Sequence, residues 1–331
     1  MGMHQRFDYN MIIMEVGGSI RRHLELYSLT TVVIGLAVGK ICQGTFFKYL
    51  IPLALFMMLY PAFLDTDIGV IIKGAFADRK LLLMSLLVNF TISPLLMFGL
   101  VQLFSAGLIP DLMVGLLIFS LIPGGGMGPA YTGMINGNVG LSIAITAVGL
   151  VMSILFMPLW TVLLIGKVVQ VPAVMIIKYL FMIIILPAAL AAISRRWIIQ
   201  IRGKTAFEKI KGQFQNMTGI GLMLLIFIIF VMNGRFVMNN YFLLTNILIP
   251  AVSFSLLLLA GSSLLAAICQ SDYGDSVGFT ISVTLKNTAV SMALATTVFQ
   301  DMTALAIAIT GPLVQLPVML SYLKIRTWSS G

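Results

Sequence analysis

The sequence predicts an all-α polytopic membrane protein, and three observations support that prediction. The 331 residues are 60% hydrophobic and only 9% charged, whereas about 25% of the residues in a soluble domain are charged. The mean hydropathy is +1.06. Apolar runs of roughly 18 residues or more recur along the whole chain, and each can cross about 30 Å of hydrocarbon as a helix.

Ten transmembrane helices are expected from these runs, with glycine, proline and charged residues marking their ends. They cover residues 26–44, 47–64, 81–105, 111–136, 138–165, 172–194, 216–234, 241–269, 275–300 and 302–323. Interfacial helices with basic faces are expected between the second and third spans, in DIGVIIKGAFADRK, and between the sixth and seventh, in SRRWIIQIRGKTAFEKIKGQ.

The basic residues predict the topology. Six of them follow the sixth span, between residues 195 and 211, whereas the loops on the other side hold few, such as Lys167 and Arg235. Ten spans with both termini in the cytoplasm satisfy the positive-inside rule. The basic residues behind the net charge of +9 are therefore interpreted as signals that orient the protein in a cell (plasma) membrane, and not as a nucleic-acid-binding surface. Residues 1–25 and 324–331 are expected to be cytoplasmic segments.

A short internal repeat suggests how the spans are grouped. GLSIAIT (Gly140–Thr146) recurs as ALAIAIT (Ala304–Thr310), and each copy is followed by a proline. With five spans in each half, residues 26–165 and 166–323 would enter the membrane from opposite sides. Such inverted repeats are typical of secondary transporters.

Several chemistries lack the residues that they need. Cys42 and Cys269 lie in or beside apolar segments, and His4 and His23 lie outside the spans, so we expect no metal site and no cofactor. An intramembrane enzyme needs a nucleophile with a base, or paired carboxylates, at membrane depth. No span offers His, Asp or Glu beyond its edges, so no enzyme activity is expected.

The fourth span contains a break in SLIPGGGMGPAYTGMINGN (Ser120–Asn138). Pro123 removes a helical N–H, and Gly124, Gly125 and Gly126 allow backbone conformations that other residues avoid. Such a break at membrane depth must be buried in protein or line a watery cavity. It exposes backbone groups that bind ions and anions; a tight helix crossing without a ligand is the alternative.

The ninth span is the expected counterpart, because ISVTLKNTAVSMALATT places many polar residues in an apolar run. Lys286 lies about 11 residues from either end, too deep to reach the interface comfortably, and burying an ammonium there costs at least about 2.5–3.5 kcal/mol. Either desolvation leaves this lysine neutral, or an anionic substrate compensates its positive charge. A structural lysine that caps the carbonyls of a broken helix is the alternative.

These segments resemble the bile acid:sodium symporter superfamily, which also contains arsenite-efflux permeases of the arsenical-resistance type. The similarity lies in PGGG and GNVGLSIAIT, joined to LKNTAVSMALA, and it covers nearly the whole chain. MMLYPAFLDTDIGVIIKGAFADRK and GPLVQLPVMLSYL are closer to the arsenite permeases. The resemblance implies ten spans in two inverted repeats, a panel and a core domain, and broken fourth and ninth helices that cross at the substrate site.

The departures from the family concern sodium first. Where sodium-coupled members have a Ser-Asn pair after the first break, this chain has Gly128 and Pro129. A glutamate and a glutamine that bind sodium in the ninth span are replaced by Ser282 and Lys286, whereas a matching pair on the fifth span remains, Ser142 and Thr146. A fixed cation at this place repels sodium, so sodium-independent transport is expected.

Arsenite permeases of the superfamily use a cysteine in the fourth span and a glutamate in the ninth. This chain has no cysteine in its fourth span, and Ala289 stands at the position of the glutamate. Thiolate chemistry for a soft metalloid therefore lacks its ligand, although efflux of arsenite or a related metalloid stays the alternative function.

The function expected from these residues is secondary transport of a small, anionic organic solute by alternating access, with Lys286 in place of the coupling cation or as a proton-titrating switch. Hydrogen bonds to the solute are expected from the Gly124–Gly126 backbone, Thr132, Asn287 and Thr288. The former ion sites would be lined by Ser142, Thr146, Ser282 and Thr284. A channel or receptor is disfavoured by the repeat and the paired breaks.

Overall fold

The structure is a computed structural model that describes residues 24–42, 44–64, 68–104, 107–125, 127–166, 173–299 and 301–329. Within these ranges the regular elements are all helical, which confirms the predicted class. Seven helical stretches in the described residues are long and apolar enough to cross a membrane: Phe46–Leu64, Arg79–Phe104, Val139–Leu164, Val174–Arg202, Asn216–Asn239, Leu244–Ile268 and Asp301–Thr327.

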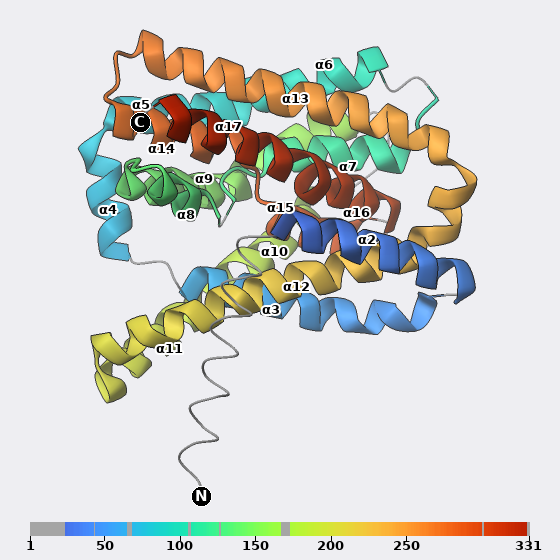
Figure 1. Ribbon diagram of the computed structural model, residues 1–331, viewed down its shortest axis with the longest axis horizontal. Helices are drawn as coiled ribbons and strands as arrows, with labels where there is room; N and C mark the ends of the chain where they lie inside the picture. The colour runs from blue at the N-terminus through green and yellow to red at the C-terminus, as the bar shows by residue number, and fades with distance from the viewer. Residues whose placement is uncertain are drawn as a thin grey trace, which may run out of the picture. The chain divides into compact units, whose positions relative to one another are not determined.

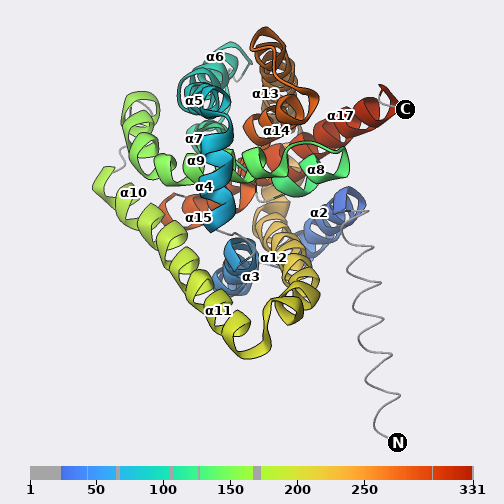
Figure 2. The ribbon, with the colours of Figure 1, turned by 90° about the vertical axis from the view of Figure 1, so that its left-hand side faces the viewer.

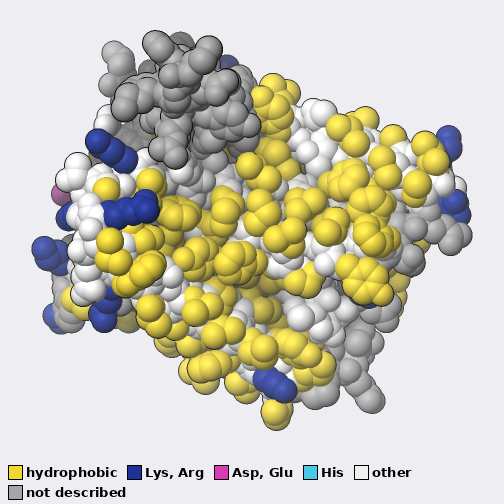
Figure 3. All heavy atoms as spheres, turned by 90° about the horizontal axis from the view of Figure 1, so that it is seen from below, with side chains coloured by type: hydrophobic (Ala, Val, Ile, Leu, Met, Phe, Trp, Pro, Cys, Tyr) yellow, Lys and Arg dark blue, Asp and Glu magenta, His cyan; other side chains and the backbone are white. Residues whose placement is uncertain are grey.

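Three shorter apolar helices occupy the other places where spans are predicted: Leu26–Ile41, Pro110–Leu121 and Thr288–Val298. Two of them are short because the predicted fourth and ninth spans are interrupted. The inverted ten-helix repeat stays a prediction. Hydrophobic side chains cover the middle of the face shown in Figure 3, and Lys and Arg side chains lie towards its margins, as expected for a chain that crosses a bilayer.

The chain forms two compact units, one made of Met1–Asp65 with Ile185–Gly234 and the other of Thr66–Ile184 with Arg235–Gly331. The described elements of the first unit are α2 (Leu24–Ile41), η1 (Gly44–Leu50), α3 (Ile51–Leu64), α11 (Leu186–Arg202) and most of α12 (Lys204–Asn239). Its α-helices are labelled in Figure 1. The predicted cytoplasmic segment 1–25 lies almost wholly outside the described residues.

Glycines let the helices of the first unit approach closely. A Cβ atom on Gly221 of α12 would lie 2.8 Å from the Met58 nitrogen of α3, and one on Gly39 of α2 would meet the Val231 carbonyl oxygen of α12. Small residues at helix contacts are a general means of packing in lipid. The segment after the predicted sixth span is not a separate helix, because α11 continues to Arg202 and α12 begins at Lys204, after Gly203 with φ +79°.

The second unit contains the interrupted helices. Its elements before residue 186 are α4 (Ile68–Ala77), α5 (Arg79–Leu87), η2 (Val88–Ile92), α6 (Ser93–Phe104), α7 (Pro110–Leu121), α8 (Gly128–Met134), α9 (Val139–Trp160), η3 (Thr161–Ile165), α10 (Ala173–Leu180) and η4 (Phe181–Ile185). Its later elements are α13 (Tyr241–Ile268), α14 (Tyr273–Thr284), α15 (Thr288–Val298), α16 (Asp301–Ala308), η5 (Ile309–Gln315) and α17 (Leu316–Ser329).

Helices far apart in sequence pack together in this second unit. The short α4 is a separate helix, as predicted, and it packs on α9 (Figure 2), with Gly74 against the Gly140 carbonyl oxygen. Helix α16 packs on α7, where Gly115 meets the Thr303 carbonyl oxygen, and α13 packs along α14 (Figure 1). Most residues of α7, α14 and α16 are buried, so α7 and α14, which belong to the two interrupted spans, lie in the core of this unit.

Among the described residues, four segments have π-helical hydrogen bonding: η2, η3, η4 and η5. Each has a proline within it or within three residues of it: Pro94, Pro158, Pro187 and Pro312. A proline inside a helix removes one hydrogen bond and crowds the preceding turn, and a local π turn is one way in which a helix absorbs the disturbance. Two of these segments, η2 and η5, supply side chains to the site.

Candidate functional site

The helices are interrupted at both places where the sequence predicts breaks. Helix α7 ends at Leu121 and α8 begins at Gly128, while α14 ends at Thr284 and α15 begins at Thr288. The two breaks cross, because Pro123 and Lys286 form an antiparallel bridge. We call the paired segments, residues 122–125 and 285–287, the crossing.

The backbone groups at the crossing satisfy one another. The Gly125 N–H donates to the Leu285 carbonyl oxygen (3.1 Å), and the Asn287 N–H donates to the Ile122 carbonyl oxygen (3.0 Å). Each bond joins one broken helix to the other. Polar backbone that would be too costly to expose to lipid is thus paired inside the protein.

The first segment of the crossing, residues 122–125, requires glycine. Gly124 has φ +70°, which favours glycine, and a Cβ atom there would lie 2.7 Å from the Thr146 Cα atom of α9. A Cβ atom on Gly125 would lie 3.1 Å from the Lys286 carbonyl oxygen. Gly124 therefore lies against α9, and Gly125 lies against the second break. Both backbones approach their neighbours so closely that there is little room for a side chain. Gly126 lies outside the described residues.

Lys286 is enclosed at the crossing, with only 2% of its surface exposed. Its ammonium Nζ atom donates to the Oδ1 atom of Asn89 on η2, at 2.7 Å. The Nδ2 atom of Asn89 is buried and has no partner among the described residues. The lysine therefore has a hydrogen-bond partner that the sequence did not predict, but this amide is neutral and would not compensate a positive charge on Nζ.

Gln315 on η5 bridges the gap in the second broken helix. Its Oε1 atom accepts from the Lys286 backbone N–H (3.1 Å), and its Nε2 atom donates to the Thr284 carbonyl oxygen (2.9 Å). The break takes these two backbone groups out of the helical pattern, and Gln315 is itself 2% exposed. One side-chain amide thus satisfies a donor and an acceptor that would otherwise be buried without partners.

Neither Asn89 nor Gln315 was among the predicted site residues. Each is an isolated amide in an apolar segment, in SLLVNFTISP and GPLVQLP. Polar side chains at membrane depth are costly and tend to face a polar partner, and that signal could have found both. The sequence does not show the π turns of η2 and η5, so it could not show where these amides point.

The residues predicted to line the former ion sites are partly assembled. The hydroxyl groups of Ser142 on α9 and Ser282 on α14 are 2.6 Å apart and share a hydrogen bond. A Cβ atom on Gly128 would lie 3.8 Å from the Ser142 Oγ atom and 4.0 Å from the Thr146 Oγ1 atom. This Oγ1 atom is buried without a hydrogen-bond partner among the described residues.

Two other predicted members of these former ion sites are placed differently. Thr284 pairs instead with Ser262 of α13, with 3.2 Å between their hydroxyl oxygens. Pro129 lies in the first turn of α8 and is partly exposed.

The residues predicted to bind the solute fall into two groups. The Asn287 side chain caps α15 by accepting from the Val290 N–H at 3.0 Å, and Thr288 is partly exposed and packs against Gly311 of η5. Both therefore lie at the crossing. Thr132 does not join them, because its hydroxyl donates within α8 to the Gly128 carbonyl oxygen at 2.9 Å.

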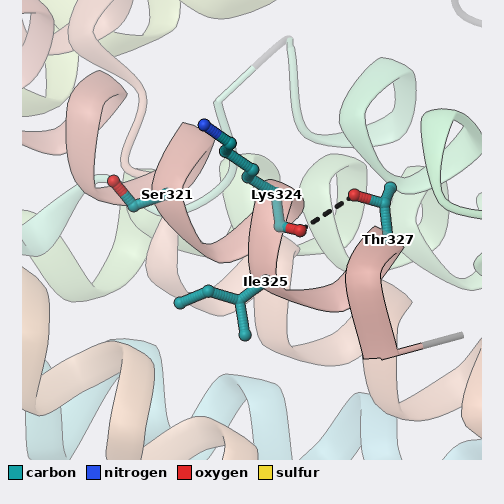
Figure 4. A pocket seen from close by; sticks show the side chains of 4 residues that line it. All are labelled: Ser321, Lys324, Ile325 and Thr327. Carbon is teal, nitrogen blue, oxygen red and sulfur yellow. Dashed lines mark hydrogen bonds between the residues drawn. The ribbon is translucent and has the colours of Figure 1, made fainter.

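A hollow of about 730 Å³ lies away from these residues, against α17. Ser321, Lys324, Ile325 and Thr327 line it (Figure 4), and the Thr327 hydroxyl donates to the Lys324 carbonyl oxygen at 2.9 Å. All four side chains lie towards the end of one helix, and none of them belongs to the predicted site.

Interrupted helices that cross inside an apolar bundle are the architecture of many secondary transporters, and this is the class that the fold and the crossing define. The chain belongs to the Sodium Bile acid symporter family, whose model matches residues 52–240. It is therefore a membrane transporter, and the resemblance drawn from the sequence is confirmed.

Two relatives extend this comparison over nearly the whole chain. An uncharacterized transporter of Synechocystis sp. is 24% identical, with 94% of this chain and 90% of the relative covered. The arsenical-resistance protein Acr3 of Alkaliphilus metalliredigens is also 24% identical, with 93% of this chain and 92% of the relative covered.

Proposed function

We propose that this transporter moves a small organic anion by alternating access without sodium, and that the Lys286 ammonium takes the place of a coupling cation. In this proposal ten helices form two inverted five-helix repeats, arranged as a panel and a core. The protein would lie in the plasma membrane with both termini in the cytoplasm.

The enclosed ammonium at the crossing is the main support for the proposal. Two like charges 4 Å apart repel by about 4 kcal/mol at an effective dielectric constant of 20, so a sodium ion beside the charged Lys286 is strongly disfavoured. The place of a carboxylate is taken by Ser282, whose hydroxyl already pairs with Ser142. Neither serine supplies the negative charge that would offset the repulsion.

The chemistry of the crossing favours an anionic solute. Helix α15 begins at the crossing, and the N-terminal end of a helix carries partial positive charge. The partly exposed Thr288 hydroxyl and Gly125 lie beside it, together with the positive charge of Lys286. A hydroxyl donor and positive potential at one place suit a carboxylate or a similar group.

The division into two units also supports a moving core. Each unit takes segments from both predicted repeats, and both broken helices belong to the same unit. A transporter that works by alternating access needs a body that holds its binding site together while that body moves.

A thermal-shift screen in detergent, followed by uptake into proteoliposomes, tests the proposal. A library of small carboxylates would be compared in sodium and choline buffers, since a ligand that binds the native state raises the melting temperature. We expect a carboxylate to stabilise the protein and to be taken up equally in both buffers. Lys286→Met should abolish both effects, while the exposed control Lys324→Met should retain them.

Two results would contradict the proposal. One is a stabilising carboxylate that acts only in sodium buffer. The other is a Lys286→Met variant that is folded and transports as well as the unmodified protein does.

Efflux of arsenite or a related metalloid is the second candidate, and the arsenical-resistance relative favours it. The cysteines Cys42 and Cys269 both lie outside the elements of the crossing, which weighs against thiolate binding. Growth of an arsenite-sensitive, pump-deficient host with and without the gene distinguishes the candidates. Growth on arsenite that depends on the gene would replace the organic anion with the metalloid.

A further inference from the structure

A groove lies between the end of α11 and the first turns of α12, within the first unit. Its volume is about 260 Å³, and it is lined by Trp197, Ile198, Ile201, Arg202 and Ile210. We call it the basic groove, because the one charged side chain among these described lining residues is an arginine. Its other walls are apolar, so the groove combines a surface for hydrocarbon with a site for negative charge.

A stripe of exposed apolar side chains leads along α11 to the basic groove. Leu190, Ile193, Trp197 and Ile201 recur at helical spacing and are between 46% and 66% exposed. The other face of α11 packs on the core, where Ala191 is buried with Leu64 and Phe207. The apolar window of the helical stretch Val174–Arg202 is only 22% buried, so the stripe continues an exposed apolar surface of the kind that suits lipid.

Positive charge gathers around the same end of α11. Residues 193–210 contain five basic residues and one acidic residue: Arg195, Arg196, Arg202, Lys204, Lys209 and Glu208. The Arg195 guanidinium lies over the Phe207 ring, 5.4 Å from its centroid, whereas Arg202, Lys204 and Lys209 are exposed. Basic clusters next to a transmembrane helix attract anionic lipid headgroups, and tryptophan is enriched at the membrane interface.

We propose that the basic groove binds an anionic phospholipid. An acyl chain would lie along the stripe on α11, and the phosphate would lie between Arg202 and Lys204. A zwitterionic lipid can cover the stripe equally well, but it has no net charge to match the excess of basic residues. The proposal rests on the surface of the first unit alone, so it does not depend on the solute or on the crossing.

Fluorescence quenching by brominated lipids tests this site, because Trp197 lies in the groove. The full-length protein would be reconstituted in vesicles that contain small, equal fractions of brominated phosphatidylglycerol or brominated phosphatidylcholine. We expect the anionic lipid to quench more strongly at each fraction. Replacing Trp197 with phenylalanine should remove this excess, which assigns the excess to the groove rather than to the other two tryptophans.

Paired variants separate the basic groove from general surface charge. Arg202→Gln with Lys204→Gln should raise the fraction of anionic lipid needed for half-maximal quenching by about 30-fold, since each basic residue near an anionic surface contributes roughly fivefold. The control Lys40→Gln with Lys324→Gln removes two exposed basic residues elsewhere and should leave that fraction unchanged. Equal quenching by both lipids, or equal loss in both pairs of variants, would overturn the proposal.

Discussion

Gln315→Leu is the most direct test of how the crossing is held. The substitution replaces the amide with an apolar side chain of similar size on η5, which removes the acceptor for the Lys286 N–H and the donor to the Thr284 carbonyl oxygen. Both backbone groups are then buried without partners. Each such group costs about 1–3 kcal/mol, so the variant should lose about 2–6 kcal/mol.

The membrane setting raises the question whether a smaller loss applies. Interhelical side-chain hydrogen bonds in membrane proteins contribute only about 0.6 kcal/mol on average, because the unfolded chain finds other partners in the bilayer. Two bonds of that strength would sum to only about 1 kcal/mol. The bonds of Gln315 go to backbone groups that a break has taken out of the helical pattern, so the larger cost applies.

Melting temperatures in one detergent, at one scan rate, measure the effect. At roughly 2 °C per kcal/mol for a chain of this size, Gln315→Leu should melt about 4–12 °C below the unmodified protein. The matched control is Gln102→Leu, which makes the same change at an exposed position of α6. If the two variants melt together, the reasoning about the buried backbone groups is refuted.

Three further predictions concern the same crossing. Gly124→Ala should lower the melting temperature, because φ is +70° and the added Cβ meets Thr146, whereas Gly99→Ala, with no atom within 4 Å of its Cβ position, should not. Asn89→Leu should reduce the yield of folded protein measured by size-exclusion chromatography, and Lys286→Met in the same chain should restore most of that yield, because an ammonium without a partner costs more than an apolar pair. Lys286→Gln combined with Ser282→Glu should create sodium-dependent stabilisation that neither the unmodified protein nor Lys286→Gln alone shows, and a melting temperature that does not respond to sodium would count against the cation replacement.

The apolar runs predicted the spans, the glycine-rich break predicted the first interruption, and the polar residues around Lys286 predicted the second. Hydrophobicity reports which segments enter lipid, and a PGGG sequence cannot continue a regular helix. The positions of Asn89 and Gln315 could not be predicted in the same way, because a π turn rotates every later side chain around the helix axis. The continuous passage of α11 through Arg202 was missed as well, because its basic residues indicated a separate interfacial segment.

The burial of Lys286 limits how a positive charge on its side chain can interact with a solute. Its Nζ atom is bonded to Asn89, its backbone N–H is bonded to Gln315, and only 2% of its surface is exposed. A solute therefore cannot reach the Lys286 Nζ atom in the described conformation. A buried charge still acts at a distance, since Coulomb interactions are stronger where water is excluded. If an anion binds at the partly exposed Thr288, the lysine contributes potential rather than a hydrogen bond, and any residue that keeps a positive charge at this depth would serve the solute as well.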